Sequence, residues 1–253
     1  MKTIIAVLAL GEYWKGAKVL FHTLRKYGRL PGSVDLVAMG AEHPCGSTVA
    51  QPQLADYSWV PVSMVHFPRV AGKFNAFSLG GYDRVILMDA DMMCLGDCSY
   101  LWSDRIGRLP FYASRDCASI VYYKKEIKRI DLDENLLFNA GTMVFHPSLL
   151  GPDWPGNFLK AICERKIDAY DGGDQGYLNA YFQKMRPELE IGYLPQEYNG
   201  CTDQYIPKLP DHAQRIVHFT GANVNPWHPT VGPGDRRYPL LQRWQREWRE
   251  CAG

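Results

Sequence analysis

Buried-strand and helix patterns alternate over the first ninety residues of the chain. The continuous apolar run Thr3–Leu10 is typical of a strand buried on both faces. In Trp14–Tyr27 apolar residues recur at the spacing of one helix face, and Gly28 follows as a stop signal. Further strands are predicted at Val34–Met39, Val60–Val65 and Arg84–Met88, and a short helix at Gly72–Leu79. This alternation predicts parallel strands joined by right-handed crossovers, as in nucleotide-binding α/β folds.

The pattern becomes less regular in the rest of the chain. We expect strands at Gly141–Phe145 and Arg215–Phe219, and helices at Asn157–Arg165, Asp174–Lys184 and Leu240–Arg249. No linker, repeat or low-complexity stretch divides the sequence, which predicts one α/β domain over residues 1–253. Within it we expect a nucleotide-binding half at 1–95, a second half at 96–230, and a helical tail at 231–253.

Composition excludes several classes of function. Hydrophobic residues make up 46% and charged residues 22% of the 253, which is typical of a folded globular chain. With 28 Lys and Arg against 27 Asp and Glu, the net charge of +1 gives no electrostatic case for nucleic acid or an anionic membrane surface. The apolar runs are far shorter than the roughly 20 residues that span a bilayer, so we expect no membrane span.

Cysteine usage and the start of the chain indicate a cytoplasmic protein. The 7 cysteines are an odd number, scattered and without a CxxC pair, which favours free thiols in a reducing compartment. The first apolar run is followed by Gly11–Lys15 and not by a small-residue cleavage site, so a buried strand is favoured over a signal peptide.

An acidic pair follows the predicted strand Arg84–Met88. In Asp89-Ala90-Asp91 the two carboxylates are two residues apart and point the same way if the strand continues. They lie at the carboxyl end of a strand, where open α/β sheets bind ligands. Like charges this close repel unless a divalent cation neutralises them. Oxygen ligands favour Mg²⁺ or Mn²⁺, and an added His nitrogen favours Mn²⁺. The alternative is a turn with two solvated aspartates.

Two later segments carry further candidate groups. Asp171–Gln175 places a Gly-Gly turn between two carboxylates at a predicted helix start. Asp174 could be the N-cap of that helix, although capping does not explain Gln175. Val217–Gly221 ends a predicted strand with His218, for which a packed core histidine is the alternative to a ligand.

These segments, together with the first strand, resemble the retaining glycosyltransferases of glycosyltransferase family 8, of the glycogenin and galactinol synthase type. The matching stretches occur in order from about Ile4 to Trp227. They are Tyr13–Ala17, Lys73, Met88–Asp91, Phe138–Gly141, Asp171–Leu178, Leu194-Pro195 with Tyr198-Asn199, and His218–Gly221 with Pro226-Trp227. The resemblance implies a GT-A type nucleotide-diphospho-sugar transferase domain, with a Rossmann-like mixed sheet flanked by helices. It makes residues 96–230 the half that binds the donor sugar and the acceptor.

The resemblance also implies an activity. It is that of a retaining hexosyltransferase that moves glucose or galactose from a UDP-sugar, with Mn²⁺ or Mg²⁺, to an acceptor that it does not identify: a polyol, a glycan or a protein side chain. Asp89, Asp91 and His218 would hold the metal, which would stabilise the departing UDP. A homodimer is one possible assembly, because members of the family often form dimers.

On the nucleotide side of the donor, the family pattern assigns four residues. Ala9 and Leu10 would offer backbone hydrogen bonds to the base, and Tyr13 would stack on the uracil ring. Lys73 would lie near the phosphate or the sugar, the alternative being a solvated helix residue.

On the sugar side, the same pattern makes Asp174 and Gln175 the catalytic residues. They would lie closest to the anomeric carbon, where a carboxylate or an amide stabilises developing positive charge. The other expected donor-binding residues are Ala90, Asp116, Asn139, Ala140, Asp171 and Gly221.

The chain departs from the family pattern before Pro226-Trp227. Glycogenin-like members carry a Lys there that contacts the diphosphate, whereas this chain has Asn225. Binding of the diphosphate would then be weaker, or Arg69, Arg236 or Arg237 would make the contact instead. Two alternatives stay open: a sugar-nucleotide or glycan-binding protein that has lost turnover, and a nucleotidyltransferase that makes nucleotide sugars. Self-glucosylation at Tyr205 is not favoured, because the sequence around it matches glycogenin poorly.

Overall fold

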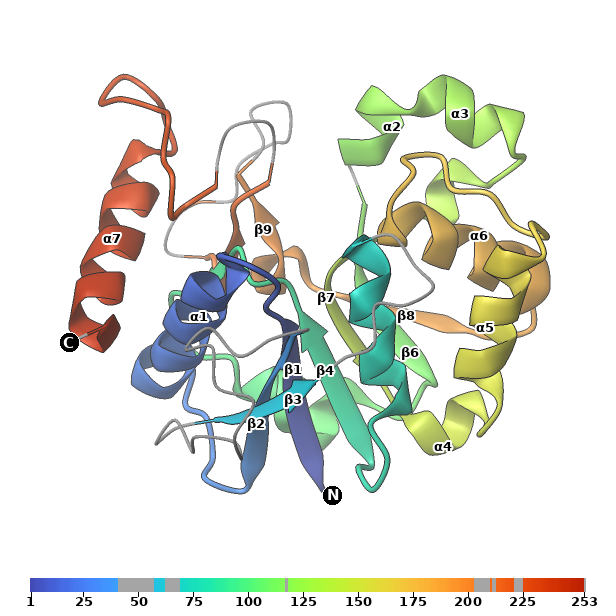
Figure 1. Cartoon of the computed structure of the whole chain (residues 1–253), viewed down its shortest axis with the longest axis horizontal. Coiled ribbons are helices and arrows are strands. Elements are labelled where there is room, and N and C mark those ends of the chain that lie inside the picture. Colours follow the sequence, from blue (N-terminus) through green and yellow to red (C-terminus); the bar gives the residue numbers. More distant parts are fainter. Residues whose placement is uncertain are drawn as a thin grey trace.

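A seven-stranded mixed sheet forms the centre of the molecule (Figure 1). The computed structural model describes residues 1–40, 57–61, 69–116, 118–202, 210, 213–220 and 225–252. The strand order is β3-β2-β1-β4-β7-β6-β8. These strands are β1 (Thr3–Leu8), β2 (Val34–Gly40), β3 (Ser58–Pro61), β4 (Arg84–Met88), β6 (Phe111–Arg115), β7 (Phe138–Phe145) and β8 (Ile191–Leu194). The first four run parallel to one another, β7 is antiparallel to both of its neighbours, and β8 is parallel to β6.

A small second sheet lies beyond the carboxyl end of β4. Its order is β5-β10-β9, with β5 (Met92–Cys94) antiparallel to β10 (Ile216–His218) and β9 (Gly200–Cys201) parallel to it. Because β5 begins one residue after Asp91, this sheet connects the acidic pair directly to the strand that ends in His218.

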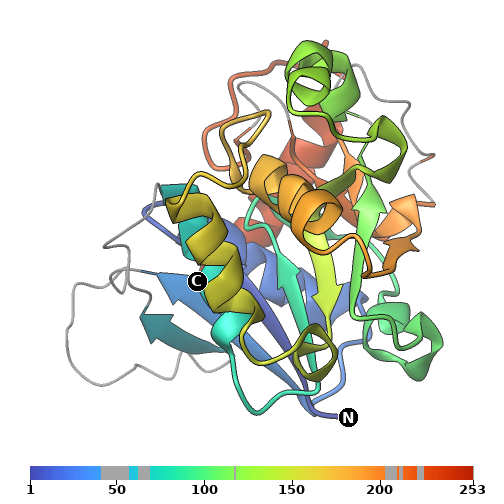
Figure 2. The ribbon, with the colours of Figure 1, turned by 90° about the vertical axis from the view of Figure 1, so that its right-hand side faces the viewer.

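Helices cover both faces of the large sheet. The α-helices are α1 (Tyr13–Tyr27), α2 (Ala118–Tyr122), α3 (Lys124–Arg129), α4 (Pro147–Leu150), α5 (Trp154–Cys163), α6 (Asp174–Met185) and α7 (Tyr238–Ala252). The 3₁₀ segments are η1 (Arg69–Ser78), η2 (Ser99–Trp102), η3 (Asp104–Ile106), η4 (Glu134–Leu136) and η5 (Gln196–Tyr198). In Figure 2, α5 and α6 lie in front of the sheet.

Alternating residues of the central strands supply two cores. Ile4 and its neighbours on one face pack with Phe158 of α5 and Phe182 of α6, whereas Ile5 on the other face packs with Leu20 of α1. Both faces of β1 are therefore apolar, which explains its unbroken hydrophobic sequence. None of the helices in the described part of the chain has the length and apolar character that a bilayer crossing requires.

The α/β class and the parallel order of the first strands are confirmed. Several bounds differ from expectation. β1 ends at Leu8 because the chain then turns through Gly11, whose φ is +54°. The short helix before β4 is the 3₁₀ segment η1, and β3 starts at Ser58, while residues 62–65 of that predicted strand lie outside the described residues. β5, β6, β8 and β9 were not predicted. The division into halves and tail stays a prediction.

Candidate metal and sugar-nucleotide site

The acidic pair and His218 meet where the two sheets join. The backbone N–H of Asp89 donates to Gly141 O on β7 at 2.9 Å, and the N–H of Phe219 donates to Asp91 O at 2.9 Å. Met92 of β5 is paired with His218 of β10. Strand pairing thus brings the imidazole beside both carboxylates.

The three side chains have the spacing of ligands that share one cation. His218 Nε2 lies 3.3 Å from Asp91 Oδ1 and 3.5 Å from Asp89 Oδ2. Atoms bound about 2.1 Å from a metal and at right angles to each other are roughly 3.0 Å apart, so these distances fit neighbouring positions of an octahedron. The donor set of two carboxylates and one imidazole suits Mn²⁺. The residues present therefore fit the predicted metal.

Hydrogen bonds behind His218 orient its ring. Nδ1 donates to Asn199 Oδ1 at 3.0 Å, which leaves Nε2 facing the carboxylates. The amide of Asn199 in turn donates to Asn139 Oδ1 at 2.8 Å, and both asparagines are buried. Such outer contacts fix the tautomer of a metal-binding histidine. Asn199 lies in one of the stretches that match the family, and its role becomes visible only in the structure.

Charges around the ring change its protonation. Burial opposes a charged imidazolium, but the Asp91 carboxylate outweighs that effect and holds the pKa of His218 well above its usual value. Burial also raises the pKa of Asp89, against the opposing influence of Lys73. Metal binding must therefore displace a proton from this cluster.

Gly141 has no room for a side chain beside the imidazole. A Cβ there would lie 2.5 Å from His218 Cε1 and Nδ1, and 2.6 Å from the Met92 methyl group. The glycine in the predicted stretch Phe138–Gly141 thus lets β7 approach the ring closely.

Lys73 links the acidic pair to the predicted catalytic residue. Its Nζ lies 2.6 Å from Asp89 Oδ1 and 2.5 Å from Asp174 Oδ2, and it donates to Ala140 O at 3.1 Å. Only 6% of the side chain is exposed, so the alternative of a solvated helix residue is wrong. Burial disfavours the ammonium, yet the two carboxylates raise the pKa of Lys73 above its usual value. Lys73 is therefore charged at neutral pH.

Asp171, and not Asp174, satisfies the amides at the start of α6. Asp171 Oδ1 accepts from the N–H groups of Gly173 at 2.8 Å and Gly176 at 3.1 Å. The N-cap alternative for Asp174 is therefore wrong, because its carboxylate pairs with Lys73 instead. The Gly-Gly turn serves this geometry, since Gly172 has a φ of +68°.

Gln175 is held by hydrogen bonds at both ends of its amide. Nε2 donates to Asp116 Oδ2 at 2.6 Å, Ser119 Oγ at 2.8 Å and the Tyr170 hydroxyl at 3.2 Å. Oε1 accepts from Ala140 N at 3.0 Å. The predicted residues Asp116, Ala140 and Gln175 are thus in direct contact.

The structure describes the three residues that are expected to bind the base. Tyr13 is half-exposed, and its ring meets Trp227 edge-on at 4.9 Å between centroids. Partial burial, then Asp91 and Asp89, raises the pKa of Tyr13, which reflects its proximity to the metal cluster. The N–H of Ala9 already donates to Met39 O at 2.7 Å, so only its carbonyl is left for a base. Leu10 O accepts from Tyr13 N at 3.1 Å.

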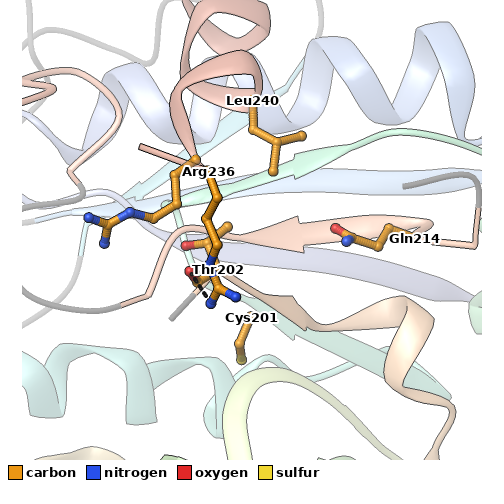
Figure 3. A pocket seen from close by; sticks show the side chains of 6 residues that line it. Cys201, Thr202, Gln214, Arg236 and Leu240 are labelled. Atoms are coloured by element: carbon orange, nitrogen blue, oxygen red, sulfur yellow. Dashed lines mark hydrogen bonds between the residues drawn. The ribbon is translucent and has the colours of Figure 1, made fainter. Parts of the chain in front are cut away.

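Asn225, which stands where glycogenin-like members carry a lysine, makes a hydrogen bond within its own turn. Asn225 Oδ1 accepts from Trp227 N at 3.3 Å. Of the arginines considered as replacements, Arg237 pairs with Asp235 at 2.7 Å, and Arg236 points toward Thr202, whose carbonyl accepts from Nη2 at 3.5 Å (Figure 3). Gly221, Tyr205 and the side chain of Arg69 lie outside the described residues.

A second group with metal-ligand atoms lies between α1 and α7. It consists of His22, Glu247 and Glu250. Lys26 Nζ lies 3.0 Å from Glu247 Oε2 and 2.5 Å from Glu250 Oε2, so the ammonium group of this lysine already pairs with both carboxylates. This group ties the C-terminal helix to α1.

Known proteins resemble the chain in sequence and in fold. The sequence model of glycosyl transferase family 8 matches residues 64–230. Glycogenin-1 of Mus musculus is 27% identical over 167 residues, 64% of this chain and 42% of the relative. The putative UDP-glucuronate:xylan alpha-glucuronosyltransferase 5 of Arabidopsis thaliana is 32% identical over 158 residues, 61% of this chain and 22% of the relative. The chain thus spans less than half the length of these relatives.

Among solved structures, the galactosyltransferase LgtC in complex with donor and acceptor sugar analogues superposes with a TM-score of 0.67 at 15% identity. The superposition covers 98% of this chain and 95% of LgtC. At that identity the likeness shows the GT-A fold alone. The family match, which covers most of the chain, goes further: the chain belongs to glycosyl transferase family 8.

Proposed function

We propose that the chain transfers a hexose, glucose or galactose, from a UDP-sugar to an acceptor with retention of anomeric configuration, using Mn²⁺ or Mg²⁺. The observation that carries the proposal is the convergence of Asp89, Asp91 and His218 within ligand spacing of one another. The name of the Arabidopsis relative, which includes UDP-glucuronate, supports a UDP-linked donor.

The chain's own residues would divide the work. The two aspartates and His218 hold the cation, which when bound supplies Lewis-acid stabilisation of the diphosphate leaving group. Lys73 holds Asp174 in place through its 2.5 Å ion pair. Gln175, fixed through its amide, adds a dipole that is already oriented before the donor binds. Tyr13 offers an exposed ring for the base.

The experiment is a UDP-release assay with UDP-glucose and UDP-galactose, with and without EDTA. We expect release from at least one donor, loss of release with EDTA, and loss in Asp91→Asn. Asp153→Asn is the matched control, because Asp153 is exposed and its side chain makes no capping hydrogen bond. UDP release that ignores EDTA would refute the metal assignment. Donor binding without release would favour a sugar-nucleotide-binding protein.

A further inference from the structure

A short helical hairpin stands directly beside the proposed catalytic glutamine. It consists of α2 and α3, residues 118–129, and we call it the α2–α3 hairpin. Asp116 Oδ1 accepts from the N–H groups of Ala118 at 3.0 Å and Ser119 at 3.3 Å, while its Oδ2 accepts from Gln175. Ser119 Oγ also accepts from Gln175. The first turn of the hairpin is therefore built onto the residue expected at the reacting centre.

Two tyrosines lie on the same face of the hairpin as Ser119. Tyr122 and Tyr123 follow Ser119 by three and four residues, the spacing of neighbours on a helix surface. The N–H of Tyr123 donates to Ser119 O at 2.7 Å, so the helical turn continues through it. Both rings thus belong to the side of the hairpin that meets Gln175.

A series of neighbouring tyrosine rings connects Gln175 to the protein surface. The Tyr170 hydroxyl accepts from Gln175 at 3.2 Å, and the Tyr170 and Tyr123 rings are 5.9 Å apart. Tyr123 and Tyr122 follow at 6.4 Å. Exposure rises in the same order, from 3% for Tyr170 to 36% for Tyr123 and 47% for Tyr122.

The rings of Tyr122 and Tyr123 are not part of the buried side of the hairpin. Its buried side chains are Ser119 and Ile127, whereas Val121 and both tyrosines are exposed. Neighbouring exposed apolar side chains are a mark of ligand or partner sites. Here they adjoin a site that must receive a second substrate.

The chemistry of the surface fits a sugar ring. A pyranose has an apolar C–H face bordered by hydroxyls, and tyrosine offers an apolar ring face together with a polar hydroxyl. A linear polyol has no such rigid face. We propose that Tyr122 and Tyr123 bind a pyranose unit of the acceptor, and that the acceptor is an oligosaccharide. This inference rests on the proposed function.

The reaction that this acceptor would undergo is a hexosyl transfer. Its hydroxyl oxygen forms a bond to the anomeric carbon of the donor. The bond from that carbon to the diphosphate oxygen breaks, its electron pair stays with UDP, and the hydroxyl proton passes to the released UDP. Rings that position the acceptor and not the donor should influence transfer more than hydrolysis by water.

The test compares transfer with hydrolysis in one preparation. Maltotriose, cellotriose and the linear polyol sorbitol are offered with the active UDP-sugar, and products are measured by mass spectrometry beside total UDP release. In Tyr122→Ser/Tyr123→Ser we expect the ratio of oligosaccharide transfer to hydrolysis to fall about tenfold. The loss should appear as a higher KM for the oligosaccharide, because each lost ring contact contributes modestly to acceptor affinity. Tyr122→Phe/Tyr123→Phe keeps the ring faces and should restore most of the ratio.

Leu149→Ser is the matched control. Leu149 is 47% exposed, like Tyr122, but lies on α4, which follows the far end of β7. An unchanged ratio in the double serine variant would overturn the inference. Transfer to sorbitol with none to either trisaccharide would also overturn it. A wild-type chain that releases UDP from no UDP-sugar would instead refute the proposed function itself.

Discussion

Gly141→Ala is expected to weaken metal binding without removing a ligand. The new Cβ would lie 2.5 Å from His218 Cε1 and Nδ1, and real Cβ atoms essentially never come closer than 3.0 Å to another atom, so the ring must retreat by at least about 0.5 Å. Metal sites tolerate displacements of only about 0.2 Å. Retreat is also opposed by the Asn199 hydrogen bond behind the ring. We expect Mn²⁺ affinity to fall at least about tenfold, the effect of disturbing the groups that orient a ligand.

The assay is calorimetric titration of Mn²⁺ into the purified chain, with thermal unfolding measured beside it. Overpacking of this kind costs about 1–3 kcal/mol, so a lower melting temperature is expected as well. Gly156→Ala is the control, because it makes the same chemical change where nothing lies within 4 Å of the added Cβ. Wild-type Mn²⁺ affinity in Gly141→Ala would refute the view that His218 is positioned as a ligand.

Three further predictions concern charge. Lys73→Met should weaken UDP-sugar binding about tenfold and by more than it weakens Mn²⁺ binding, because the substitution removes a buried positive charge expected near the phosphate or the sugar but removes no metal ligand; equal losses in the two titrations would contradict this. Because the pKa of His218 is raised in the metal-free chain, Mn²⁺ must displace its proton, so affinity should fall as pH is lowered; calorimetry in buffers of different ionisation enthalpy should show proton release, and its absence would count against the assignment. Glu247→Ala should lower the melting temperature more than Glu250→Ala, because Glu247 is fully buried beside Lys26 whereas Glu250 is exposed; the reverse order would be inconsistent with a tether between α1 and α7.

The acidic pair shows how far a local pattern can lead. The apolar run before Asp89 is long enough to indicate a buried strand, and the abrupt change to Asp-Ala-Asp marks its carboxyl end. Family likeness supplied His218, but what brings it to the pair is the short antiparallel pairing of β5 with β10. Strands of three residues leave almost no periodic signal, so β5 could not be predicted.

The ion pair between Lys73 and Asp174 could not be predicted from the sequence either. Asp171 lies just before α6 and Asp174 is its first residue, and from the sequence either fits the capping preference. The choice depends on Lys73, which withdraws Asp174 into an ion pair and leaves the amides to Asp171. Nothing local to either aspartate encodes that partner.

Strands β6 and β8 were missed for a different reason. β6 ends in Ser114 and Arg115 after a register shift against β7, and β8 contains Gly192, so neither has a clean alternation of polar and apolar residues. Gly192 is required because a Cβ there would meet the Tyr112 ring at 2.2 Å. Such glycines reflect packing between strands, which appears only once the sheet is formed.

Pulsed EPR of the chain loaded with one equivalent of Mn²⁺ examines the metal centre at the level of its ligands. We expect coupling to an imidazole ¹⁴N nucleus in the wild type, its loss in His218→Gln, and its retention in His22→Gln, which alters the lysine-filled group between α1 and α7. Tight Mn²⁺ binding whose ¹⁴N coupling survives His218→Gln would contradict the proposed site.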